Sequence, residues 1–346
     1  MQTTLFYLLH QQNQLLAATN AIKNSQTFDM TPIAFDSILE DTFNEKYRFT
    51  KQQILNIRAA LAIPVNIKLE NGCRVDGNLA LCILLDKLAY PVRNSRLEES
   101  YGIHRSNISR IINFLLFFIN DNWSHTLHLR QCHINEYQEQ WAHCVYDRGA
   151  ALDNCIGFID GTCRQNCRPI RDQKSIYNGH KRYHCLKYQS VTAPNGLILD
   201  LSGPFIGIRH DIRILRESNL LDRLALISDQ YVIYGDPAYS MDRNICCPYE
   251  GILTPDQLAF NQSMSRTRIA VEWNYARVLA LFAGLRMSKS FKILLSPVGL
   301  YYRVAVILCN IHCCFNGNQI SIYFNCPPMS LDKYLHICQP GQCYEQ

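Results

Sequence analysis

Hydrophobic residues in the first 150 positions recur with the spacing of helices rather than strands. Leu55–Pro64 and Leu79–Pro91 both carry apolar residues three or four positions apart, and both stop at a proline, which cannot continue a helix. The run Ile111–Ile119 is shorter than the roughly 18 residues of a membrane span. We therefore expect a buried helix there, no membrane segment, and an all-helical N-terminal domain over residues 1–150.

A helix-turn-helix pattern lies within this region, near residues 95–120. Leu97 and Tyr101 are one helical turn apart, Gly102 permits a turn, and Ser106 can cap a second helix beginning at the next residue. In such motifs the start of the second helix contacts DNA, although an ordinary pair of packed helices would show the same pattern. The candidate DNA-binding residues here are Arg105, Ser106, Asn107 and Arg110.

Short apolar runs bounded by turn residues replace the helical pattern at about residue 151. Pro194-Asn195-Gly196 joins two of these runs as a hairpin. Helices are expected to begin near Asp211 and to cover Ser265–Leu285. This succession predicts an α/β domain over residues 151–335, followed by a C-terminal tail, 336–346. The predicted strands are Ile156–Asp160, Tyr183–Ala193, Leu197–Gly203 and Tyr231–Asp236.

Composition limits the class of protein without identifying it. With 346 residues, 48% of them hydrophobic, the chain can bury the cores of two domains. It has 16 cysteines but opens without a basic secretory leader, so we expect reduced thiols in an intracellular compartment. No cysteine pair has a matched zinc-site spacing, and His312, between Cys309 and Cys313, is expected to be a core or interface histidine.

Three acidic residues stand where an α/β domain can build a site. Two predicted strands end on Asp160 and Asp236, which places both carboxylates at the carboxyl edge of the sheet. Glu272 lies in an otherwise apolar and basic helix and is not expected on the free surface. Three converging carboxylates repel one another unless divalent cations neutralise them. Such oxygen ligands suit Mg²⁺ or Mn²⁺, and two ions can promote phosphodiester cleavage.

Each carboxylate also has a purely structural interpretation. Asp160 can bond to the backbone of an Asp-Gly-Thr turn, and Asp236 can begin an Asp-Pro turn. Glu272 can pair with Arg268 one helical turn earlier. Only the placement of all three on successive elements favours a shared site over three separate structural roles.

A basic segment begins one residue after Asp160. Residues 161–190 contain seven Lys/Arg against Asp172 alone, a net charge of +6, whereas the whole chain carries +5. Interleaved aromatic residues make this segment suited to holding a nucleic-acid backbone, and Gly161 would leave room for DNA to approach. A solvated hairpin is the alternative. The candidate DNA-binding residues are Arg164, Arg168, Lys174, Lys181, Arg182 and Lys187.

Five motifs follow one another in the second half of the chain. They are GFIDGT, YNGHKRYHCLKYQSVTAPNGLI, GIRHDIRILRES, YGDPAYS and RIAVEWNYARV. Together they resemble the DDE superfamily nuclease domain of PIF/Harbinger-type transposases. This resemblance, over about residues 156–334, implies an RNase H-like fold and metal-dependent hydrolysis and rejoining of DNA phosphodiesters.

The resemblance implies a catalytic triad of Asp160, Asp236 and Glu272 that holds two Mg²⁺ or Mn²⁺ ions. Asp211 is a further candidate ligand, although it is equally placed to cap a helix. DNA, as transposon ends and target site, is the implied substrate. A homo-oligomer and a separate Myb-like partner protein are also expected. No basic cluster has the form of a nuclear import signal, so a nuclear protein with a cytoplasmic pool would depend on that partner for import.

Two positions depart from the family pattern. Cys163 stands where relatives often have histidine, and Tyr275-Ala276 replaces a frequent Phe-Gly. Neither change removes a metal ligand, but an intact triad does not prove turnover. Two functions therefore stay open: an active endonuclease/transposase, and a domesticated, catalytically silent DNA-binding or scaffold protein. Hydrolysis of sugars needs only two carboxylates and leaves the basic segment unexplained.

Overall fold

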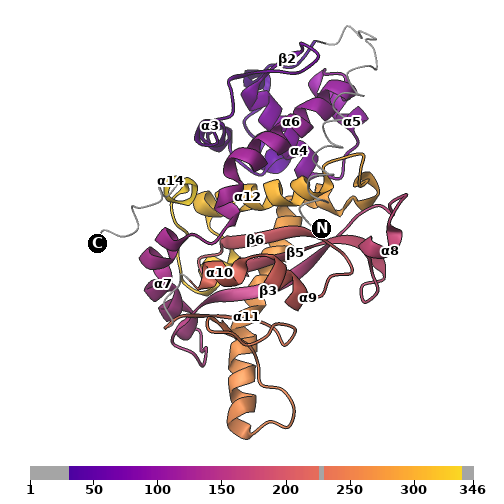
Figure 1. Cartoon of the computed structure of the whole chain (residues 1–346). Helices are drawn as coiled ribbons and strands as arrows, with labels where there is room; N and C mark the ends of the chain where they lie inside the picture. Colours follow the sequence, from indigo (N-terminus) through magenta and orange to yellow (C-terminus); the bar gives the residue numbers. More distant parts are fainter. Residues whose placement is uncertain (1–30, 226–229, 337–346) are drawn as a thin grey trace. The chain divides into compact units, whose positions relative to one another are not determined.

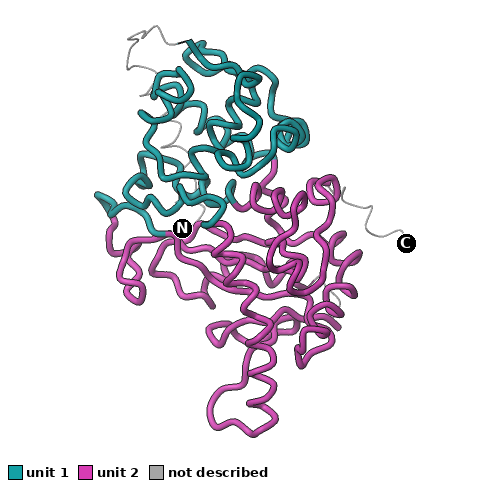
Figure 2. Tube along the Cα trace, turned by 180° about the vertical axis from the view of Figure 1, so that it is seen from behind, with its two compact units in different colours: residues 1–122, 165–171, 279–305 teal, residues 123–164, 172–278, 306–346 magenta. Residues whose placement is uncertain are grey.

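The computed structural model describes residues 31–225 and 230–336 (Figure 1). The chain divides into two compact units, coloured separately in Figure 2. Both units are discontinuous in sequence, so segments from the second half of the chain belong to unit 1. The domain boundary predicted near residue 150 stays a prediction. Unit 1 comprises residues 1–122, 165–171 and 279–305, and unit 2 comprises residues 123–164, 172–278 and 306–346.

Unit 1 is built around helix α4 (Gly77–Ala89), which is buried on nearly all sides. The Asp76 carboxylate accepts from the Leu79 N–H and caps its start. A helix without a polar face must be enclosed, and α4 contacts α2, α3, α5 and η3. The other elements lying wholly or mostly in unit 1 are η1 Phe35–Ser37, α2 Thr42–Tyr47, α3 Lys51–Ala60, β1 Asn66–Lys68, β2 Arg74–Asp76, α5 Asn94–Tyr101, α6 Arg105–Trp123, η3 Ala283–Arg286 and η4 Ser288–Ser290.

A small hairpin corrects the all-helical prediction for the N-terminal region. Strands β1 and β2 pair antiparallel, with Ile67 opposite Val75. Each strand has three residues and only its central one is buried. Strands this short leave too few alternating positions to be recognised in the sequence.

Helices α5 and α6 follow one another through a three-residue turn, residues 102–104. Gly102 has a φ of +61°, and a Cβ there would meet the Thr31 carbonyl oxygen, so this position requires glycine. Helix α6 begins at Arg105 rather than at Asn107. The Ser106 hydroxyl does not cap it as predicted, because it is hydrogen-bonded to His104 Nδ1 at 2.7 Å. The DNA-binding role of this pair stays a prediction.

Unit 2 contains a mixed β-sheet, in agreement with the predicted α/β class. Its strand order is β4-β5-β3-β7-β8, with β6 paired to β5. Strand β7 is parallel to both β3 and β8, whereas β5 and β6 form the predicted antiparallel hairpin. Gly196, at a φ of +85°, supplies the turn. The strands are β3 Cys155–Gln165, β4 Tyr177–Asn178, β5 Tyr183–Thr192, β6 Ile198–Ile206, β7 Val232–Tyr234 and β8 Ile245–Cys246.

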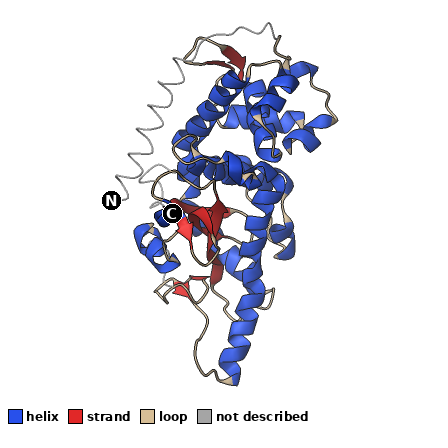
Figure 3. Cartoon of the chain, turned by 90° about the vertical axis from the view of Figure 1, so that its right-hand side faces the viewer, coloured by secondary structure: helices blue, strands red, loops and turns tan. Residues whose placement is uncertain are grey.

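Helices cover both faces of this sheet (Figure 3). On β5, Ser190 Oγ is hydrogen-bonded to Tyr275 of α11 (Pro255–Leu281), whereas the adjacent Gln189 bonds to Ser218 after α9 (Asp211–Glu217). Alternate side chains of a strand point to opposite faces, so α9 and α11 lie on opposite sides. The remaining elements are η2 Ser124–Leu127, α7 Gln131–Tyr146, α8 Gln173–Ile176, α10 Leu220–Leu224, α12 Val298–Asn316, α13 Gln319–Tyr323 and α14 Leu331–Leu335.

Helix α12 is long and apolar enough to cross a membrane by length and composition alone. In this fold, however, 61% of its apolar window is buried inside the protein, and a core helix meets the same criteria. Its residues Tyr302 to Ile311 are almost fully buried, which is consistent with that role.

Most cysteines agree with the expectation of reduced thiols. Within the described residues, thirteen are free, whereas Cys132 is disulfide-bonded. The expectation is therefore wrong at Cys132. Disulfide pairing depends on the distance between two residues in the folded chain, which sequence spacing does not give.

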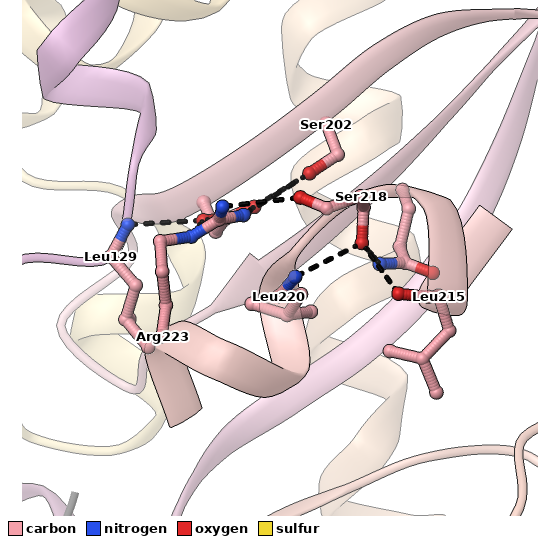
Figure 4. A network of polar contacts seen from close by, with 8 residues as sticks. Leu129, Ser202, Leu215, Ser218, Leu220 and Arg223 are labelled. Atoms are coloured by element: carbon pink, nitrogen blue, oxygen red, sulfur yellow. Dashed lines mark hydrogen bonds and ion pairs between the residues drawn. The ribbon is translucent and has the colours of Figure 1, made fainter. Parts of the chain in front are cut away.

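A buried ion pair connects β6 to α10 (Figure 4). Arg223 donates to both carboxylate oxygens of Asp200, with Nε–Oδ2 at 3.0 Å and one terminal nitrogen 3.1 Å from Oδ1. The Leu129 N–H and the Ser202 hydroxyl also donate to this carboxylate. Burial raises the pKa of Asp200, and Arg223 opposes that shift. A fully hydrogen-bonded pair of this kind is tolerated in a core.

Replacing Arg223 by methionine should strongly destabilise unit 2, because it leaves the Asp200 carboxylate buried without a cation. We expect the free energy of unfolding to fall by about 3 kcal/mol. Adding Asp200→Asn should recover part of this loss. Urea unfolding at neutral pH measures both effects. Arg216→Met, at an exposed position of α9, is the control and should change stability by no more than about 0.5 kcal/mol.

Candidate functional site

The predicted acidic residues line one cavity of about 910 Å³ in unit 2. Asp160 comes from β3, Asp211 from the first position of α9, and Glu272 from α11, while Asp236 follows β7. The tertiary fold therefore brings together four carboxylates that are widely separated in sequence. The same cavity is lined by four cations, Lys181, Lys187, Arg209 and Arg268.

Asp160 lies within β3 rather than at its end, which corrects the prediction. Strand β3 continues to Gln165, but its parallel partner β7 ends at Tyr234, opposite Phe158. Asp160 thus lies two residues after Phe158, the last residue of β3 that pairs with β7. It is near the carboxyl end of β7, which Asp236 follows. The Asp-Gly-Thr sequence suggested a turn, yet the backbone remains extended beside β5.

Tyr275 holds the backbone at Asp160 in place. Its hydroxyl donates to the Asp160 carbonyl oxygen at 2.7 Å and is also hydrogen-bonded to Ser190 Oγ at 2.8 Å. Phenylalanine, the residue that the family resemblance implies at this position, could make neither bond. This departure from the family pattern therefore adds a connection from α11 to the strand that carries Asp160.

Cations of the protein itself neutralise part of the acidic cluster. An Arg268 terminal nitrogen lies 3.0 Å from Asp160 Oδ1, and Lys187 Nζ lies 2.7 Å from Asp211 Oδ1. The buried Lys187 also donates to the Arg209 carbonyl at 2.8 Å. Arg268 therefore pairs with Asp160 and not with Glu272, and Lys187, predicted to bind DNA, is held within the site.

Negative charge is energetically unfavourable in this cavity. Burial raises the pKa of Asp160 from 3.8 to about 6, while Arg268 and the Gly161 N–H act in the opposite direction. Burial also raises the pKa of Asp236, again against the effect of Arg268. The neighbouring carboxylates add to both shifts, as expected for like charges that share a site.

Glu272 is exposed where it lines the cavity, so the expectation that it would be shielded is wrong. Its neighbour Val271 is buried. Successive helical residues point about 100° apart, so an apolar neighbour does not bury a glutamate. Among the residues that the structure describes, Glu272 and Asp236 form no ion pair. These two carboxylates are therefore the members of the cluster without a direct cationic partner.

The Tyr239 hydroxyl was missed by sequence reasoning. It is buried and has no hydrogen-bond partner in the described part of the chain. Burial raises its pKa well above 10, and Tyr275, Asp211, Asp160 and Asp236 act in the same direction. An unsatisfied buried hydroxyl is costly, and this one lies behind the cavity wall, near Gly161, because Tyr239 itself does not line the cavity. Its sequence signal was its place three residues after Asp236.

Gly161 provides space for Asp211. A Cβ at this position would lie 2.8 Å from Asp211 Oδ1, which Lys187 already holds. The space that we expected DNA to approach at Gly161 is filled by the Asp211 carboxylate. Asp211 is also the first residue of α9, but its side chain makes no capping bond there and faces Lys187 instead.

Cys163, the other departure from the family pattern, also lines the cavity. Its hydrogen bond with Cys185 lowers the pKa of the Cys163 thiol, and Lys187 and Lys181 act in the same direction against burial. A polarisable sulfur thus occupies a position where the family resemblance implies a histidine, and no carboxylate is displaced by it.

The donor set of the cavity fits a divalent cation by its chemistry. Four carboxylates provide only oxygen ligands, which hard ions such as Mg²⁺ and Mn²⁺ prefer. In residues 31–225 and 230–336, however, no three His, Cys, Asp or Glu side chains are already grouped to hold a metal. An ion would therefore need to replace Arg268 and Lys187 as partners of the carboxylates.

The predicted DNA-binding residues fall in both units. Arg105, Ser106, Asn107, Arg110 and Arg168 belong to unit 1, and the others to unit 2. Asn107 Oδ1 accepts from both Asn71 and Arg110, which fixes the start of α6 against the β-hairpin. In unit 2, Lys181 lines the cavity, Lys174 and Arg182 are exposed, and Arg164 contacts Thr162 and the Tyr275 ring.

The raised pKa of Asp160 predicts a specific dependence of stability on pH. Because the folded protein binds this proton more tightly than the unfolded chain, the contribution of Asp160 to stability should fall as pH rises from about 4 to about 6. The buried His133 and His312, whose pKa values burial lowers to about 4, contribute in the opposite direction, so the comparison with Asp160→Asn isolates the effect of Asp160. Asp160→Asn should remove on the order of 2 kcal/mol of this change. Urea unfolding with a chelator present measures it. Glu272→Gln is the control, and equal pH slopes in wild type and Asp160→Asn would contradict the assignment.

Gly161→Ala should force the Asp211 carboxylate out of its position beside Lys187. We expect a loss of about 1–3 kcal/mol in the free energy of unfolding, as for other overpacked sites. The same substitution in an Asp211→Ala background should cost much less, because the clashing oxygen is absent. A double-mutant cycle by urea unfolding measures this coupling. Additive effects would show that the two residues do not compete for space.

Comparison with known families identifies residues 159–310 with the model for the DDE superfamily endonucleases. The matched segment is less than half of the chain and contains Asp160, Asp211, Asp236 and Glu272. It supports a transposase-like nuclease that acts on DNA, and it does not distinguish subtypes within the superfamily. No curated protein and no solved structure matches this chain.

Proposed function

We propose that this protein is a metal-dependent DNA endonuclease and transposase of the PIF/Harbinger type, with an RNase H-like catalytic core. The observation that carries the proposal is the shared cavity: Asp160, Asp236 and Glu272, predicted from separate motifs, all line it. The superfamily match over residues 159–310 supports the reaction class. The pattern of motifs, from GFIDGT to RIAVEWNYARV, is the support for the subtype.

Asp160, Asp236 and Glu272 would hold two Mg²⁺ or Mn²⁺ ions, and Asp211 would add a fourth carboxylate. When bound, such ions neutralise the carboxylates, activate the attacking water or 3′-hydroxyl and stabilise the leaving oxygen of the phosphodiester. Ligation needs ionised carboxylates, and burial raises the pKa of Asp160 in the metal-free protein. Protons should therefore compete with the metal ions, and metal binding should weaken as pH falls.

The surrounding side chains would position these ligands and the substrate. Tyr275 fixes the backbone at Asp160. Arg268, when released from Asp160, would leave a guanidinium beside the scissile phosphate, where it can balance the charge that develops in the transition state.

DNA would reach the site along basic residues of the 161–190 segment, among which Lys181 lines the cavity. The start of α6 would supply a second contact through Arg105, Ser106, Asn107 and Arg110. A homo-oligomer would bring two transposon ends together. Action on chromosomal DNA requires a nuclear location, with a cytoplasmic pool and a Myb-like partner protein for import.

A domesticated DNA-binding or scaffold protein is the second candidate function. Arg268 and Lys187 already pair with two of the four carboxylates, and no three candidate ligands in the described residues are grouped for a metal. A protein that had lost turnover could use these ion pairs simply to stabilise its fold. Binding of Mn²⁺ distinguishes the two functions, because only the nuclease requires it.

Purified wild-type protein should nick supercoiled DNA in the presence of Mg²⁺ and not in the presence of a chelator. Asp236→Asn and Glu272→Gln should each lower the nicking rate by about 100-fold or more, because each removes a metal ligand. Gel electrophoresis of the plasmid forms measures the rate. Asp222→Asn, which changes the same group on α10 away from the cavity, is the matched control.

Equal nicking by wild type and Asp236→Asn would overturn this assignment. Calorimetry with Mn²⁺ completes the test. Absence of both nicking and Mn²⁺ binding in the folded wild-type protein would favour the domesticated function.

A further inference from the structure

A second cavity, of about 420 Å³, lies wholly within unit 1. Helix α4, the start of α5, helix α6 and the segment 284–301 all contribute to its wall. Ser109 and Asn113, one helical turn apart on α6, provide polar groups there. This cavity is separate from the carboxylate site, and neither the motifs nor the superfamily match assigns a role to it.

The charged lining of this second cavity is entirely positive. Lys87, Arg93, Lys289 and Lys292 contribute to it, and no Asp or Glu does. None of the four forms an ion pair with a residue that the structure describes. The carboxylate cavity of unit 2, in contrast, contains as many acids as bases. Asp86, which lies behind Lys87 and does not line the cavity, is the acid that interacts with this group. Because no acid lines the cavity itself, an anion that entered it would be favoured.

Lys87 lies deepest among these cations. Its Nζ donates to the Val92 carbonyl oxygen at 2.6 Å, and burial lowers the pKa of its ammonium group. Arg93, Lys289 and Lys292 are exposed. One partly buried charge with three mobile charges around it provides both a fixed contact and long side chains that can close on a ligand.

The start of helix α5 adds a further positive contribution. Its N-cap residue, Arg93, makes no side-chain capping bond, and Asn94 at its first position lines the cavity. The first N–H groups of a helix are available for an anion when no side chain caps them. The N-terminus of α5 contributes less than the four side chains, but it also favours binding of an anion.

We propose that this cavity binds a phosphate of the DNA backbone, with Lys87, Arg93, Lys289 and Lys292 as the contacting charges. The cavity includes residues of α6, the helix whose start is the candidate DNA-reading element, so a bound strand would be held beside it. This inference rests on the proposed action on DNA. It adds a sequence-independent contact that is distinct from the carboxylate site.

The test uses the full chain and fluorescence anisotropy with a labelled duplex over a range of salt concentrations. Lys289→Gln/Lys292→Gln removes two exposed charges and leaves Lys87 to hold Val92. We expect about tenfold weaker binding near physiological salt, and a decrease of about 2 in the slope of log K against log salt. Lys51→Gln/Arg58→Gln, on α3, is the charge-matched control, because these residues already contact Asp36 and the Ile63 carbonyl.

The following outcomes decide whether this cavity binds a DNA phosphate. Equal slopes for the cavity variant and the control, or no DNA binding by wild type, would overturn it. Thermal stabilisation by inorganic phosphate that the cavity variant loses without any change in DNA binding would assign the site to a free phosphate compound, against the proposal. Asp236→Asn should keep the wild-type salt slope, because it lies outside this cavity. If wild-type protein does not nick DNA but Lys289→Gln/Lys292→Gln still lowers the salt slope, the phosphate site is supported and the nuclease function is contradicted.

Discussion

Repulsion among four carboxylates in one cavity is the constraint on which the chemistry of this protein depends. Asp160, Asp211, Asp236 and Glu272 are held together by a sheet and two helices, so they cannot separate without unfolding unit 2. Arg268 and Lys187 offset part of that cost. Burial raises the pKa of Asp160, and the neighbouring Asp236 and Asp211 add to that shift.

The same constraint explains several residues around the site. Gly161 is small because the Asp211 carboxylate lies beside it, and Tyr275 bonds to the backbone that carries Asp160. Tyr239 remains unpartnered among these acids. The first two features fix the positions of carboxylates in the cavity, and they are compatible with both the proposed nuclease and a domesticated protein.

The two cavities differ in the charges of the residues that line them. In unit 2 the acids and bases are equal in number, and the acidic members are the ones that could bind a cation. In unit 1 the charged lining is entirely basic. The net charge of +5 does not reveal this difference, because it sums the charged residues of both cavities and of the rest of the chain. The cation site and the phosphate site proposed above are the two kinds of binding that a DNA-processing protein would need.

The sequence by itself determined the α/β class of the second half, the hairpin at Pro194–Gly196 and the acidic residues that line the carboxylate cavity. It also predicted a helix over Ser265–Leu285, but the observed helix α11 begins at Pro255 and ends at Leu281. These follow from local periodicity, turn chemistry and ordered motifs, which neighbouring residues encode. Only the tertiary structure decided that β3 continues past Asp160, that Arg268 pairs with Asp160, and that residues 279–305 belong to unit 1. Those outcomes depend on contacts between segments that are distant in the sequence. A local sequence pattern does not determine which distant residues a strand, a charged side chain or a helix will contact.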